Sequence, residues 1–109
     1  MTATLFIAQR ATAAILAFAV SVHLATIIYA VRGGLNAADV LARTKGNAWF
    51  LVLYLVFVVA VAIHAPIGLR TIFREWTPWR GRSLDLALAA FSLLLIVLGL
   101  RAVFALYLP

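Results

Sequence analysis

The chain has 109 residues, of which 67% are hydrophobic and only 11% are charged, and its mean hydropathy is +1.15. A soluble domain would be close to half apolar and would carry many more charges, so the composition excludes a water-solvated core and indicates a membrane protein. The net charge of +6 falls between the apolar runs, which indicates loop charges that contact lipid headgroups and argues against nucleic acid as a partner.

Three apolar runs follow one another along the chain, at about residues 11–31, 48–73 and 84–108. Each is long enough to cross about 30 Å of hydrocarbon as a helix. The pattern therefore predicts an all-α integral membrane protein, a single transmembrane domain over residues 1–109 that folds as a three-helix up-down-up bundle.

Two loops separate the predicted spans. In the first, residues 32–47, Gly33 and Gly34 form a helix stop, and Asn36 is placed to cap a short surface helix that runs through Arg43. The second, residues 74–82, carries tryptophans typical of a membrane interface.

The positive charges favour an orientation. Five arginines lie on the side of the N-terminus and the second loop, against four basic residues on the other side. We therefore expect a multi-pass protein of the inner (cytoplasmic) membrane with a cytoplasmic N-terminus. The first group is Arg10, Arg70, Arg74, Arg80 and Arg82, and the second is Arg32, Arg43, Lys45 and Arg101.

Two histidines, His23 and His64, are the only side chains inside the spans that titrate near neutrality or bind metal, because cysteine is absent from the chain. Intramembrane ionisable residues are costly and are usually functional. The alternative to a functional role is a structural one, in which a neutral histidine is hydrogen-bonded to a backbone carbonyl or to a neighbouring helix. Their small neighbours Ala19, Ala60 and Gly68 would either admit a flat macrocycle or allow close helix packing.

The depths of the two histidines differ. Counting from Arg10 and Arg70 places the imidazoles about 6–11 Å apart along the membrane normal. The two axial nitrogens of one haem lie only about 4 Å apart, so His23 and His64 of one chain fit a single iron poorly, and if both bind haem they bind different haems. Each would need a partner ligand from another chain. Arginines suit haem propionates, and Arg10, Arg70 and Arg74 lie toward His64, whereas Arg32, Arg43 and Lys45 lie toward His23.

The end of the second span, His64-Ala-Pro-Ile-Gly68-Leu-Arg70 followed by Glu75, resembles the cytochrome b membrane anchors of succinate dehydrogenase and fumarate reductase. In that family the histidine is an axial ligand of haem b, and the arginine lies near the quinone and the iron–sulfur subunit. Gln9-Arg10-Ala-Thr12-Ala13 resembles a second family signature, with Gln9 in place of the usual histidine. Phe6 stands where a serine of the usual quinone site is expected.

A second likeness is to the two-haem anchors of the same superfamily. The context Val22-His23-Leu-Ala-Thr26 resembles that of a haem-binding histidine in their first helix. Together the two likenesses span the first two predicted helices and the loop between them, about 65 residues, and imply one or two haems b shared with another chain. That chain would be a second membrane anchor or another copy of this one.

The resemblance implies a non-catalytic electron-transfer subunit of an oxidoreductase. Peripheral flavoprotein and iron–sulfur subunits would dock on the N-terminal face, and quinone would bind near Arg10, Arg70, Glu75 and Trp76. Two alternatives stay open: a small transporter component that uses the histidines as proton relays, and a haem-free anchor or assembly factor.

Overall fold

The computed structural model describes residues 2–109. The described residues form four helices and no strand: α1 (Ala3–Gly33), α2 (Ala37–Thr44), α3 (Ala48–Trp76) and α4 (Arg82–Tyr107). Helices α1, α3 and α4 are each long and apolar enough to cross a membrane. The expected all-α, three-helix membrane bundle is confirmed.

The helices begin and end where local chemistry satisfies their terminal groups. The Thr2 hydroxyl accepts from the amide of Leu5, so α1 begins eight residues before the apolar run that predicted it. Gly34, at φ 112°, follows the last residue of α1, as the expected glycine stop requires. The carboxamide of Asn36 caps α2 through the Asp39 amide, which confirms the expected surface helix.

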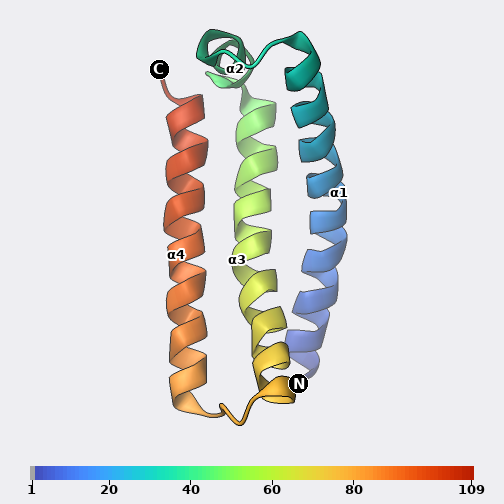
Figure 1. Ribbon diagram of the computed structural model, residues 1–109, viewed down its shortest axis with the longest axis vertical. Coiled ribbons are helices and arrows are strands. Elements are labelled where there is room, and N and C mark those ends of the chain that lie inside the picture. The colour runs from blue at the N-terminus through green and yellow to red at the C-terminus, as the bar shows by residue number, and fades with distance from the viewer. Residues whose placement is uncertain (1) are drawn as a thin grey trace.

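Helix α3 lies between α1 and α4 and packs against both (Figure 1). The N-terminus and the loop from α3 to α4 lie at one end of the bundle, and α2 and the C-terminus lie at the other. We call these the N-terminal end and the α2 end. At the α2 end the buried Thr44 hydroxyl donates to the carbonyl of Leu106 at 2.7 Å, which ties α2 to α4.

Pro66 lies inside α3, and its missing N–H leaves the carbonyl of Ala62 without its usual helical donor. The hydroxyl of Ser92 on α4 donates to that carbonyl at 2.7 Å. Because lipid offers no alternative partner, this bond satisfies a group that would otherwise be stranded in the hydrocarbon region. Helix α3 therefore stays continuous through Pro66, and the carbonyl that the proline leaves free forms a hydrogen bond that links α3 to α4.

Candidate functional site

Both histidines lie in the seam between α1 and α3, and each is held across it by a hydroxyl group. On α3, Nδ1 of His64 lies 3.2 Å from the Thr12 hydroxyl oxygen on α1. On α1, Nδ1 of His23 lies 3.0 Å from the Tyr54 hydroxyl on α3. The His23 ring also meets the rings of Tyr54 and Phe57 edge-on, at centroid distances of 5.5 and 5.7 Å.

The two histidines stand further apart in depth than their distances from the flanking arginines predicted. Thr12 marks the level of His64, and His23 lies eleven residues further along α1, so the levels differ by about 16 Å. The expectation of 6–11 Å was wrong because Arg10 and Arg70 do not lie at one height. Arg10 is two residues from the Thr12–His64 level and Arg70 is six, which places Arg70 about 6 Å nearer the N-terminal end. At this separation, the two imidazoles of one chain lie too far apart in depth to ligate one iron.

Small residues near the histidines serve helix packing. Ala19 and Ala60, which lie between the two histidine levels, are 1% and 3% exposed. A Cβ atom on Gly68 would come within 3.2 Å of the Gln9 side-chain nitrogen, so this glycine admits Gln9 from α1. Of the two readings of these residues, close approach of the helices is the one that the contacts support.

The ring of His64 leaves one nitrogen open. Among the described residues, Nε2 makes no hydrogen bond. The atom is not fully buried, so it is accessible from outside the chain. Metal-ligating histidines are typically held at one ring nitrogen by a second group while the other faces the metal. A haem iron therefore fits the donor set that His64 presents. Within residues 2–109 no group of three or more His, Asp or Glu side chains gathers to hold a bare metal ion.

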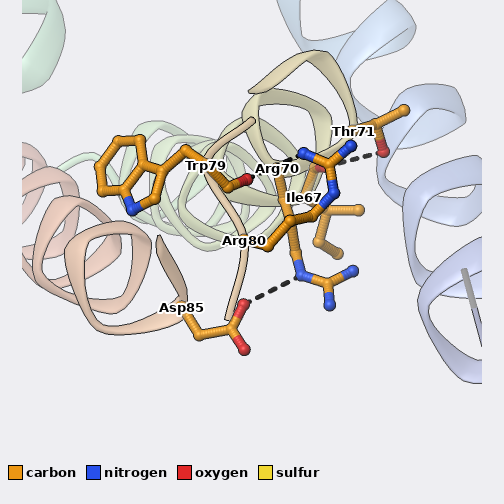
Figure 2. Close-up of polar contacts among 6 residues, drawn as sticks. All are labelled: Ile67, Arg70, Thr71, Trp79, Arg80 and Asp85. Atoms are coloured by element: carbon orange, nitrogen blue, oxygen red, sulfur yellow. Dashed lines mark hydrogen bonds and ion pairs between the residues drawn. The ribbon is translucent and has the colours of Figure 1, made fainter. Parts of the chain in front are cut away.

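Arg70 is paired with a residue that the sequence did not single out. Its Nε donates to the Asp85 carboxylate on α4 at 3.0 Å, and the two side chains are 29% and 56% exposed (Figure 2). The other two guanidinium nitrogens make no hydrogen bond among the described residues. Arg70 thus bridges α3 and α4 and keeps donors free for a further acceptor at the N-terminal end.

The other predicted site residues at the N-terminal end are exposed. Arg10 lies 5.7 Å from the centroid of the Phe6 ring, and no ion pair involves Arg10 or Arg74 within residues 2–109. Glu75 is exposed, and Trp76 is 82% exposed at the end of α3. These residues share one end of the bundle, but no contact joins them into a single site.

Arg80 has a structural role. Its guanidinium donates to the backbone carbonyl of Trp79 (Figure 2). It also donates to the backbone carbonyls of Thr77 and Arg74. These contacts satisfy carbonyls at and just beyond the end of α3, and the cation there also complements the helix dipole.

At the α2 end, His23 lines a cavity of ≈ 280 Å³. A neighbouring open groove includes Arg43, whose guanidinium carbon lies 5.3 Å from the centroid of the Tyr29 ring. Residues from all four helices line the cavity: His23, Thr26, Val40, Thr44, Phe50, Tyr54, Ala102, Val103 and Leu106.

The sequence reading missed the hydroxyl partners of the histidines and the polar groups on α4. Thr12 could have been found, because it lies three helical turns before His23 and therefore on the same face of α1. Tyr54 could have been found as the only tyrosine inside the second apolar run. Ser92 and Asp85 carry no such signal, because the register of α4 against α3 is not encoded in a local pattern.

The fold and the seam define a multi-pass membrane protein whose two histidines are held by hydroxyl groups between α1 and α3. A family model for the succinate dehydrogenase/fumarate reductase transmembrane subunit matches residues 1–105, and the chain belongs to this family. No curated protein and no solved structure gives a significant match to the chain. Family membership supports a membrane-anchor role and association with other subunits of such a complex.

Proposed function

We propose that the chain is a haem b-binding anchor that passes electrons between peripheral flavin and iron–sulfur subunits and the quinone pool. The observation that carries the proposal is the His64 ring, which is held at Nδ1 by Thr12 and open at Nε2. Haem b, when bound, supplies a one-electron carrier whose potential is set by its axial ligands and their hydrogen bonds.

His64 would supply one axial ligand near the N-terminal end, and His23 would supply one for a second haem near the α2 end. The separation of about 16 Å requires two irons and a partner ligand for each from another chain. In a homodimer with its two-fold axis along the membrane normal, residues of equal depth would pair. A different anchor subunit would meet the same need.

The N-terminal end would receive the peripheral subunits and quinone. Arg70 keeps two nitrogens free beyond its bond to Asp85, and Arg10 and Arg74 are exposed cations suited to propionates or a quinone carbonyl. Glu75 and Trp76 project at the same end, Trp76 as an exposed aromatic surface for quinone or a docked subunit. On the charge pattern of the loops, this end is cytoplasmic.

The test is haem content in the complex purified through an affinity tag on this chain. The wild type is expected to carry two haems per pair of anchor chains, and His64→Ala and His23→Ala are each expected to lose one of them. Tyr29→Phe, which keeps an aromatic ring on α1, is the matched control and should retain both. A wild-type complex without haem, isolated from haem-sufficient cells, refutes the proposal. Full haem content in His23→Ala refutes the role of His23 alone.

A further inference from the structure

We infer that Thr12 is a positioning residue that fixes the His64 imidazole in the tautomer with its proton on Nδ1, leaving the Nε2 lone pair ready for iron. The effect on haem binding rests on the proposed function, whereas the tautomer of His64 is a property of the chain without haem. The inference follows from counting the hydrogen bonds that the Thr12 hydroxyl and the His64 ring can make with each other and with the nearby backbone carbonyls.

The Thr12 hydroxyl has one proton and two backbone acceptors within reach. Its oxygen lies 2.7 Å from the carbonyl oxygen of Ala8 and 3.1 Å from that of Gln9, and 3.2 Å from Nδ1 of His64. A threonine in a helix commonly donates to the carbonyl four residues earlier, and the distance to Ala8 is the shortest of the three. With its proton given to the backbone, the hydroxyl can only accept from His64.

The alternative tautomer makes one hydrogen bond fewer. If the hydroxyl donated to an unprotonated Nδ1, the imidazole proton would sit on Nε2, which has no acceptor among the described residues. The pair would then make one hydrogen bond where the first arrangement makes two. An unmade donor is costly in an apolar surrounding, so the seam selects the Nδ1–H form.

The same count does not fix the tautomer of His23. The Tyr54 hydroxyl makes no other hydrogen bond among the described residues, so it either donates to Nδ1 or accepts from it. Each arrangement makes one bond. The two histidines therefore differ. His64 is held in the tautomer that can ligate iron through Nε2, whereas His23 adopts that tautomer only when a further group fixes which ring nitrogen carries the proton.

A protonated Nδ1 that donates to an oxygen also makes Nε2 a better electron donor. Loss of the Thr12 oxygen should weaken haem binding by about 10–100-fold, the usual cost of removing a group that holds a metal-ligating histidine. It should also shift the midpoint potential to more positive values, because a poorer donor stabilises ferric iron less.

The first arm of the test uses the tagged complex in the His23→Ala background, so that any haem present is the one at His64. Thr12→Val removes the hydroxyl and keeps the branched shape, and Thr12→Ser restores the hydroxyl. The expected result is weaker haem retention and a more positive potential in Thr12→Val, with both values returning toward wild type in Thr12→Ser. Ser21→Ala, which removes another α1 hydroxyl that donates to its own helix nine residues beyond Thr12, should leave the potential unchanged. Equal potential and retention in the valine and serine variants would overturn the inference while leaving the haem proposal intact.

The second arm needs no haem. Nitrogen-15 spectra of the histidine rings in the full wild-type chain, produced without haem in detergent micelles, report the tautomer directly. His64 is expected in the Nδ1–H form, with that preference lost in Thr12→Val if the valine variant folds. An Nε2–H ring at His64 in the wild type would overturn the inference. This arm reads the tautomer even if the complex proves free of haem, so the two failures are distinguishable.

Discussion

Ser92→Ala tests the account of how α4 is fastened to the helix that carries His64. The substitution removes the donor that serves the Ala62 carbonyl, which Pro66 has left without its helical partner. Ala62 is 3% exposed, so lipid and water cannot readily replace the lost bond. Interhelical hydrogen bonds in membranes contribute about 0.6 kcal/mol on average and at most about 1.7. Because no second donor reaches this carbonyl within residues 2–109, we expect a loss toward the upper value.

A double-mutant cycle with Pro66→Ala isolates the cause. Alanine at position 66 returns an N–H to the helix, which can then bond the Ala62 carbonyl directly. In that background Ser92→Ala should cost close to nothing, so the coupling between the two positions should be about 1 kcal/mol or more. The stability of Pro66→Ala itself does not enter the comparison.

The assay is reversible unfolding in mixed micelles, followed as SDS is added. Ser21→Ala is the matched control, because the Ser21 hydroxyl donates at 2.7 Å to a carbonyl of its own helix, four residues earlier, on an exposed face. It should change the free energy of unfolding by much less than Ser92→Ala. Equal losses for Ser92→Ala in the wild-type and Pro66→Ala backgrounds would refute the link between the proline and the serine.

Three further substitutions are read by the same unfolding assay. Gly99→Ala should destabilise the protein by about 1–3 kcal/mol, since its Cβ would lie 2.7 Å from Val58 Cγ1, about 1 Å inside ordinary contact. Gly33→Ala is the control, because a Cβ there would meet no described atom within 4 Å. Equal stability of the two variants would contradict the close contact at Gly99. Thr44→Val should lower the free energy of unfolding by about 1 kcal/mol, because it removes the buried hydrogen bond between α2 and α4. Wild-type stability of this variant would show that the bond does not stabilise the fold. Asp85→Asn should cost less than about 1 kcal/mol because its ion pair is partly exposed. A larger loss would contradict this exposure and show that the pair is shielded from solvent.

The architecture followed from hydropathy because three apolar runs leave a chain of this length no other way to satisfy its backbone in lipid. The stop at Gly34 and the cap at Asn36 were also predictable, since each depends on one residue and its nearest neighbours. The start of α1 was not, because Gln9 and Arg10 interrupt the apolar residues, whereas the helix continues through this polar pair back to Ala3.

The candidate site was predictable only in part. His23 and His64 stood out as rare groups within apolar runs, but their partners depend on how α1 slides against α3. That register is set by close contacts such as Gln9 over Gly68, which appear only when the helices are packed. The difference in depth between the two histidines was underestimated for the same reason, because charges at helix ends do not mark a common level in the membrane.

Exchange of the His64 ligand is the sharpest test of whether this histidine binds haem iron. The measurement is the low-temperature electron paramagnetic resonance spectrum of the oxidised tagged complex, with His64→Met compared with the wild type in the His23→Ala background. We expect a low-spin haem signal with two imidazole ligands in the wild-type site, and its replacement by another signal, or its loss, in His64→Met. An unchanged two-imidazole signal at full intensity in His64→Met would show that His64 does not bind the iron.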